Sequence, residues 1–416
     1  MVYYPIMFHV RNRSLYVERV PVGKLAGLCG TPLYIYSQAQ LLRNFNEFER
    51  AFKDVTHVIC YALKANSNLS VARTFSQAGA GADIVSAGEL YRAALAGFPP
   101  EKIVFSGVGK TADEMRYALD SGILMFNVES MEELAALNRV ARSLGRKAPV
   151  AIRVNPDVEA GSHRHISTGT AENKFGIQKR SILEAYRTAR SLGHIEVLGI
   201  QAHIGSQITS ARPFLALLLV LLRLVDELSR EGIRLRVVDV GGGIGITYHR
   251  ESPPSPSEIA RSFIPLLRGR NLKLLFEPGR FLVGNAGILA TRVLYRKHSG
   301  RKRFVIVDAA MNDLARPALY DAYHRITPAR SRPGRREAVD VVGPVCESGD
   351  YFARGRKMVL PGPGEVLAIE NAGAYGFAMS SQYNSRPRAA EILVNGRRWD
   401  VVRERETLKD LVHGEK

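Results

Sequence analysis

Short apolar runs alternate with segments of helical periodicity through the middle of this chain, and that alternation restricts the folds available to it. Most of the runs end in polar residues or glycine. Eight strand–helix units predict a (β/α)8, TIM-like barrel, although a doubly wound open sheet also alternates strands with helices. The expected strands are residues 57–62, 82–86, 103–106, 123–128, 150–154, 197–204, 236–240 and 274–277.

The segments between these runs carry apolar residues at helical spacing. Several begin with serine, whose hydroxyl caps a helix by accepting a hydrogen bond from a backbone N–H group. Helices are expected at residues 86–96, 130–144, 181–192 and 213–230.

The pattern changes after residue 283, where strand-like runs are separated by Gly, Pro and Arg clusters without a long amphipathic helix. This predicts an α/β barrel at 35–283 and a β-sandwich or small β-barrel at 284–416. Residues 1–34 are also strand-like and are assigned to the second domain. Its strands are expected at 287–295, 303–307, 338–342, 357–360, 366–370 and 391–394.

Charge and cysteine content restrict the partners and the compartment. The net charge of +18 suits nucleic acid or anionic small molecules, but the chain has no recognisable nucleic-acid motif. The basic run 330–336 is interrupted by Pro333 and Gly334, which is typical of a solvated loop. Three widely separated cysteines, without zinc-ligand spacing, indicate a reducing compartment and no metal site. No signal peptide or membrane span is evident, so a cytoplasmic protein is expected.

Lys64 follows the first expected barrel strand, on the face where such barrels place their active sites. A lysine partly removed from water there is available for Schiff-base chemistry. A strand-end lysine that points into solvent is the alternative, and Lys64 alone does not decide between them.

Later strand ends favour the first interpretation. Gly241, Gly242 and Gly243 follow the seventh strand, where consecutive backbone N–H groups bind phosphate in many barrels. Glu277, after the eighth, either pairs with Arg280 or holds a pyridine nitrogen protonated.

Two further strand-end residues are ambiguous. His203 either stacks on a cofactor ring or is a hydrogen-bonded histidine near the barrel mouth, and Asp83 either contacts the cofactor or orients a neighbour.

These motifs together resemble the alanine-racemase-like, or fold type III, enzymes that use pyridoxal 5'-phosphate. Within that group, four more segments resemble the diaminopimelate decarboxylases, and the resemblance covers nearly the whole chain. The first set is YALKAN at 61–66, HIGSQ at 203–207, GGG at 241–243 and EPGR at 277–280. The second set is residues 161–169, 173–177, 346–350 and 373–387.

The resemblance implies that Lys64 holds the cofactor, Glu277 pairs with its ring nitrogen, and His203 stacks on the ring. It also implies a homodimer in which the partner supplies Cys346 as the proton donor and Glu347 as a substrate contact. The implied cofactor site is Lys64, Asp83, His203, Ser206, Gly241, Gly242, Gly243, Glu277, Pro278, Gly279, Arg280 and Tyr375. The implied substrate site is Arg280, Arg316, Tyr320, Glu347 and Tyr375.

The implied reaction is decarboxylation of meso-2,6-diaminopimelate to L-lysine and CO2. Arginines recognise the distal carboxylate of such a substrate and an acid recognises its ammonium group. Without the resemblance, Arg316 and Tyr320 fit an ordinary surface patch, and Cys346 a small buried residue. The rivals are a decarboxylase of ornithine, arginine or carboxynorspermidine, a non-catalytic cofactor-binding protein, and a nucleic-acid-binding protein.

Overall fold

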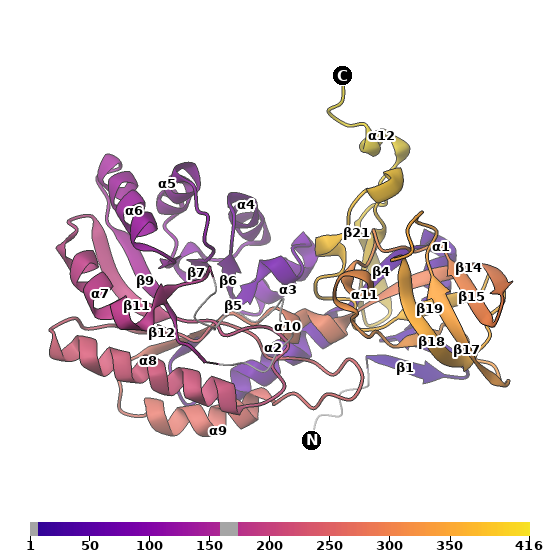
Figure 1. Ribbon diagram of the computed structural model, residues 1–416, viewed down its shortest axis with the longest axis horizontal. Coiled ribbons are helices and arrows are strands. Elements are labelled where there is room, and N and C mark those ends of the chain that lie inside the picture. Colours follow the sequence, from indigo (N-terminus) through magenta and orange to yellow (C-terminus); the bar gives the residue numbers. More distant parts are fainter. Residues whose placement is uncertain (1–6, 159–173) are drawn as a thin grey trace. The chain divides into compact units, whose positions relative to one another are not determined.

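The computed structural model describes residues 7–158 and 174–416 (Figure 1). It separates into two compact units. One comprises residues 44–247 and 251–282, and the other comprises residues 1–43, 248–250 and 283–416.

Eight parallel strands close into a barrel in the first unit (Figure 1), as the sequence predicts. Closure is made by β13, which pairs with β5, and by β8, which pairs with β9. The short β10 (Ile177–Gln178) pairs with β9 outside the ring. The barrel strands are β5 (His57–Ala62), β6 (Gly81–Ile84), β7 (Ile103–Phe105), β8 (Met125–Val128), β9 (Ala148–Asn155), β11 (Ile195–Gln201), β12 (Val237–Asp239) and β13 (Lys273–Phe276).

A helix follows each of the first seven barrel strands, and the apolar faces of these helices are buried. Five have N-terminal caps that the sequence supplies: a backbone N–H group donates to the side chain of Asn68, Ser86, Thr111, Ser130 or Ser255. Ser181 does not cap, because it ends a 3-10 turn. The helices are α3 (Leu69–Gln77), α4 (Ala87–Ala96), α5 (Ala112–Ser121), α6 (Met131–Ser143), α7 (Ile182–Ser191), α8 (Arg212–Arg230) and α9 (Pro256–Leu267).

Two helices join this unit to the other along the chain: α2 (Gln38–Phe52) and α10 (Arg280–Val283). Within residues 7–158 and 174–416, no helix combines the length and apolar character that crossing a bilayer requires.

The second unit is built on β-strands, as expected, and β14 (Gly287–Ser299) is its central strand. The first half of β14 pairs with β4 and β19, and its second half pairs with β15. The other strands are β1 (Phe8–Arg11), β2 (Ser14–Val17), β3 (Val20–Pro21), β4 (Leu33–Ser37), β15 (Lys302–Val307), β16 (Ile326–Pro328), β17 (Arg336–Val342), β18 (Tyr351–Val359), β19 (Val366–Ile369), β20 (Ala390–Asn395) and β21 (Arg398–Arg403).

Three expectations for this unit were wrong in detail. Residues 22–29 form a helix, α1 (Val22–Cys29), inside a segment that looked strand-like. Strand β18 begins at Tyr351 rather than 357, because the run Arg-Gly-Arg-Lys at 354–357 interrupts its apolar residues and hides the strand pattern. Strands β16 and β21 were not foreseen. Short helices also occur at α11 (Arg316–Tyr320) and α12 (Leu408–Leu411).

Candidate active site

Lys64 lies in a 3-10 turn directly after β5, at the carboxyl end of the barrel strands. Its Nζ is 2.5 Å from Oδ2 of Asp83, which lies in β6 and is fully buried. The lysine side chain keeps 38% of its surface exposed. The amine is therefore held at the barrel mouth by a buried carboxylate, which argues against a lysine that simply points into solvent.

Glu277 follows β13 on the same face of the barrel and is buried. Its Oε1 accepts hydrogen bonds from Ser106 Oγ at 3.2 Å and Asn127 Nδ2 at 2.9 Å. Its Oε2 accepts one from Gln201 Nε2 at 3.2 Å. Uncharged donors at the ends of β7, β8 and β11 thus fix the carboxyl, and the ion pair with Arg280 that the sequence allowed is not formed.

A second buried carboxyl, Asp239 at the end of β12, lies beside Glu277. Its Oδ1 accepts the Gly241 N–H at 2.9 Å. Its Oδ2 receives no N–H or O–H donor from the described residues. The contact between the two carboxyls is therefore a hydrogen bond only when one of them carries a proton.

The pKa shifts of the two carboxyls also favour a protonated carboxyl in this pair. Burial raises the pKa of Asp239 to about 6. Burial, and then the neighbouring Asp239 and Asp83, raise the pKa of Glu277 well above its ordinary value. Two carboxyls in one desolvated site titrate as a pair, and burial favours the protonated form of each.

The glycine-rich segment after β12 is packed too tightly for side chains. A Cβ on Gly242 would lie 2.2 Å from the Glu277 carbonyl oxygen. Gly243 has a φ of +109°, and a Cβ there would lie 2.3 Å from the Gly205 carbonyl oxygen. The loop thus presents backbone at close range, which is what phosphate binding by N–H groups requires.

The loop contacts the other strand-end residues. The Gly242 N–H donates to His203 Nδ1 at 3.2 Å, which assigns the ring proton to Nε2. Burial, with Arg153 and Lys64 nearby, holds the pKa of His203 well below its ordinary value. His203 is therefore a neutral imidazole.

Arg280 and Ser206 lie on the same side of the barrel. The Arg280 guanidinium donates to Ser206 Oγ from Nε at 3.3 Å and from a terminal nitrogen at 3.1 Å. A Cβ on Gly279 would meet Ala65 Cβ at 2.9 Å, so the EPGR turn packs against the segment that carries Lys64. The Pro278 carbonyl accepts the Ala62 N–H at 3.2 Å.

These residues fit pyridoxal phosphate. A primary amine, a close-packed glycine loop and a neutral imidazole are gathered at one end of the barrel with a buried acid pair. Three buried acceptor atoms near the acid have no hydrogen-bond partner among the described residues, and they leave polar capacity for a bound group. They are Asp83 Oδ1, Asn127 Oδ1 and Gln201 Oε1.

The remaining predicted residues lie in the other unit. Arg316 begins α11, is buried, and lies over the Tyr248 ring with its guanidinium carbon 4.9 Å from the ring centroid. It also donates to His324 Nε2 at 3.4 Å. Tyr320 ends the same helix. Tyr375 has a φ of +54°, an unusual conformation for a tyrosine that marks a constrained position.

Cys346 and Glu347 are exposed in the single chain. Asp350 fixes their turn by accepting the N–H groups of Val345 and Met311, each at 2.7 Å. Tyr383 donates its hydroxyl to Glu347 Oε2 at 2.9 Å. The alternative of a small buried Cys346 does not hold, because this turn presents the thiol to solvent in the single chain.

Sequence reasoning missed Ser106, Asn127 and Gln201, which hold Glu277, and gave no role to Asp239. Each is a polar residue at or just after the end of a barrel strand, and that position was the available signal. Residues 161–169 and Asn173 of the sequence motifs lie outside the described residues.

Comparison with known proteins identifies the family. Residues 38–284 match the model of the pyridoxal-dependent decarboxylase, pyridoxal binding domain. The chain is 52% identical to the diaminopimelate decarboxylase of Vibrio cholerae, over 96% of this chain and 95% of that protein. The chain belongs to the diaminopimelate decarboxylase family.

Other members agree over the full length. The diaminopimelate decarboxylase of Pseudomonas aeruginosa is 50% identical over 98% of both chains. The crystal structure of the Helicobacter pylori enzyme complexed with L-lysine superposes with a TM-score of 0.91 at 44% identity, over 94% of this chain and 98% of that one. The predicted family, fold class and cofactor are thereby confirmed: this family member is a pyridoxal-phosphate enzyme with a TIM-like barrel and a separate β-sheet domain.

Proposed function

We propose that this chain removes CO2 from the D-configured centre of meso-2,6-diaminopimelate and releases L-lysine. The observation that carries the proposal is full-length similarity, at 52% identity, to a diaminopimelate decarboxylase. It is supported by the convergence of Lys64, Glu277 and the glycine loop at one end of the barrel.

Each cofactor-site residue has a role that its environment supports. Lys64 presents its amine to the cofactor and Asp83 orients that amine. The backbone of Gly241, Gly242 and Gly243, with the Gly279–Arg280 turn and Ser206, binds the phosphate. His203 lies against the ring, and Tyr375 contacts the cofactor.

Glu277 holds a proton at the pyridine nitrogen, and its bonds from Ser106, Asn127 and Gln201 keep it aligned. When bound, pyridoxal phosphate supplies an aldehyde for amines and a ring that accepts the electron pair left when CO2 departs. The barrel mouth orients the carboxylate that leaves as CO2. Cys346 then delivers a proton to the carbon atom from which that carboxylate has departed.

Substrate selection rests on charge. Arg280, Arg316 and Tyr320 bind the distal carboxylate, because a guanidinium and a phenol hydroxyl both donate hydrogen bonds to it. Glu347 binds the distal ammonium group. Ornithine and arginine lack this second amino-acid end, so these residues would have fewer contacts to make with them.

We further propose a homodimer in which Cys346 and Glu347 serve the partner's site. Their exposure on a fixed turn of the single chain supports this role. Residues 35–283 would act as the cofactor-binding domain, and residues 1–34 and 284–416 as the domain that completes the partner's site. The three free thiols favour the cytoplasm as the working compartment.

The test is CO2 release from meso-diaminopimelate, L-ornithine, L-arginine and carboxynorspermidine, with each product identified. Only the first is expected to react efficiently. Lys64→Ala should abolish turnover and the cofactor's absorbance band near ~420 nm. Lys53→Ala, an exposed lysine of the same unit, should leave both unchanged. Turnover of ornithine without turnover of meso-diaminopimelate would overturn the substrate assignment.

A further inference from the structure

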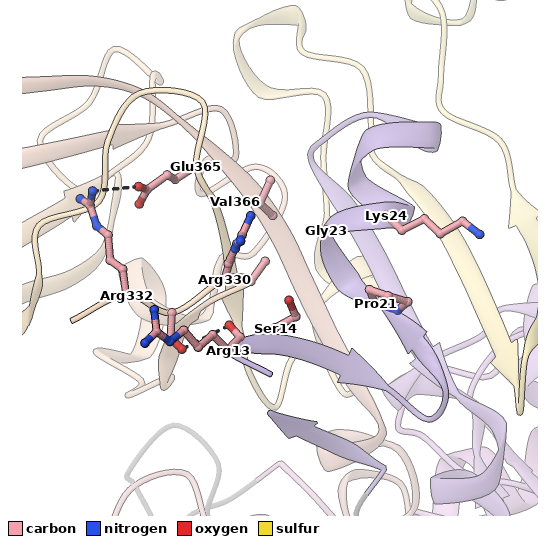
Figure 2. Close-up of a pocket in the computed structure, with 11 residues that line it drawn as sticks. Arg13, Ser14, Pro21, Gly23, Lys24, Arg330, Arg332, Glu365 and Val366 are labelled. Carbon is pink, nitrogen blue, oxygen red and sulfur yellow. Dashed lines mark hydrogen bonds and ion pairs between the residues drawn. The ribbon is translucent and has the colours of Figure 1, made fainter. Parts of the chain in front are cut away.

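The β-strand unit carries a hollow of about 570 Å³ that the proposed chemistry does not use. One wall is the β1–β2 hairpin, another is α1, and a third is the loop before β17 (Figure 2). The volume suits a small molecule rather than a macromolecule. Its lining includes Arg13, Lys24, Arg330, Arg332 and Glu365, with Pro21, Ala329 and Val366 as an apolar wall.

The charge of this hollow is strongly positive. Glu365 is its one acidic lining residue, and that carboxylate is already paired with Arg332 at 3.3 Å (Figure 2). Within the described part of the chain, the side chains of Arg13 and Arg330 form no hydrogen bond or ion pair. The guanidinium groups of Arg13 and Arg330 can therefore donate hydrogen bonds to a bound anion.

A second hollow of about 380 Å³ adjoins the first and shares Arg330, Arg332 and Glu365 with it. Its lining adds Arg325, Arg336, Arg356 and Lys357. The cations continue over both hollows, so an anion with more than one charged group can contact several of them together.

The walls are fixed before any ligand arrives. Ser331 donates its N–H to the Arg13 carbonyl oxygen at 2.6 Å and its hydroxyl to the same oxygen at 3.2 Å. Leu15 donates its N–H to the Ala329 carbonyl oxygen at 2.8 Å. The basic loop before β17 is therefore hydrogen-bonded to the β1–β2 hairpin. Arg13 and Arg330 thus extend from backbone segments that these hydrogen bonds hold in place. Most of the run 330–336 is exposed, as expected of a solvated loop, while the backbone of Ser331 is hydrogen-bonded to the hairpin.

Arg13 occupies a position that favours glycine. The hairpin turn has two residues, Asn12 and Arg13, with φ of +48° and +64°. Such a turn most readily takes Asn-Gly, because glycine adopts the second conformation without steric cost. A long cationic side chain stands there instead, beside the hollow.

We propose that these adjoining hollows bind a small molecule that carries two or more adjacent phosphate groups. The arginines provide bidentate donors for the phosphates, and the apolar wall accepts an uncharged part such as a nucleoside. Inorganic pyrophosphate and a nucleoside diphosphate share this chemistry. The site is separate from the phosphate-binding loop of the barrel.

The test is titration calorimetry of the holoenzyme, saturated with pyridoxal phosphate so that the glycine loop is occupied. Pyrophosphate, ADP and adenosine are the probes. Binding of ADP and pyrophosphate is expected, with none for adenosine. Tighter binding of ADP identifies a nucleotide site, and equal binding identifies a site for the phosphates alone.

Variants locate the site. Arg13→Gly and Arg330→Gln should each weaken pyrophosphate binding about tenfold, while Arg397→Gln, an exposed arginine of the same unit, should change it less than about twofold. Arg13→Gly should leave thermal stability equal or higher, because it relieves the positive φ. Glu365→Gln should tighten binding about threefold, and Asp400→Asn should not.

The proposal is overturned if neither pyrophosphate nor ADP gives binding heat at millimolar concentration. It is also overturned if Arg397→Gln weakens binding as much as Arg330→Gln does, since that would mean attraction to the general positive charge of the chain. Decarboxylation by the variants is expected to be normal, so failure here leaves the proposed reaction untouched.

Discussion

Asp239 ends β12 and Glu277 directly follows the neighbouring β13, and both carboxyls are buried with raised pKa values. Asp239 also accepts the Gly241 N–H, so the carboxyl that assists the acid is tied to the phosphate-binding loop. A substitution of Asp239 is therefore expected to alter both the position of Glu277 beside the cofactor ring and the backbone of the phosphate-binding loop.

The pKa of Asp239, raised from 3.8 to about 6, makes a prediction for stability. A carboxyl whose pKa is higher when folded takes up a proton on folding, so the contribution of Asp239 to the free energy of unfolding falls as pH rises from 3.8 to about 6 and is constant above that. Asp239→Asn removes this loss: Nδ2 takes the place of the protonated oxygen and Oδ1 still accepts the Gly241 N–H. The cofactor-free variant should be almost as stable as the parent near pH 4 and about 3 kcal/mol more stable at pH 7.

Urea unfolding at a series of pH values measures this difference. Asp54→Asn, an exposed carboxyl in the same unit, should show no such pH-dependent gain. An Asp239→Asn protein that is less stable than the parent at pH 7 would contradict a raised pKa at Asp239.

The sequence predicted Lys64, Glu277 and the glycines because each is unusual where it stands. A lysine or glutamate at the end of an apolar strand costs desolvation free energy and calls for a reason. Asn127 and Gln201 escaped notice because uncharged polar residues at strand ends are common. Their role depends on which side chain they face across the barrel, and periodicity contains no such information.

At the scale of elements, the loop after β12 works through its lack of side chains. Gly242→Ala would place a Cβ 2.2 Å from the Glu277 carbonyl oxygen and displace both segments. Affinity for pyridoxal phosphate should fall more than about tenfold, since phosphate binding needs the backbone N–H groups in register. Gly109→Ala is the control, because nothing lies within 4 Å of its added Cβ. Titration followed by cofactor absorbance measures both affinities, and equal values would argue against the loop as the phosphate site.

Element prediction succeeded where side-chain pattern and burial agree. Barrel strands are buried on both faces and read as apolar runs, so β5 has the expected bounds. Strand β18 differs, with exposed Arg354 and Gly355 within it, and only its partner β17 makes it a strand. Ser181 shows the converse: a residue suited to capping does not cap when the preceding turn already directs the chain into the helix.

At the scale of the whole molecule, the proposed shared sites predict complementation. Lys64→Ala and Cys346→Ala proteins should each be nearly inactive. After co-refolding in equal amounts, half the dimers are mixed and each contains one intact site, so about a quarter of the parent activity should return. The measurement is CO2 release from meso-diaminopimelate. No recovery, with mixed dimers demonstrated by a tag on one variant, would mean that each chain completes its own site.

The division into two kinds of unit was predictable at this scale because strand–helix alternation stops near residue 283. The surface through which two copies would assemble was not predictable from the sequence pattern. Cys346 and Glu347 are exposed on a fixed turn, and no periodicity in one chain specifies the surface of a second copy that would cover them.

The pairing of the barrel's first strand with its last has a consequence for synthesis. Strand β5 acquires its second neighbour only when β13 has emerged from the ribosome, and β4 waits still longer, for β20 near the C-terminus. Until then both present unpaired backbone along a hydrophobic edge. A nascent chain of this protein therefore spends most of its translation unable to complete either sheet, and chaperones would protect it mainly during that interval.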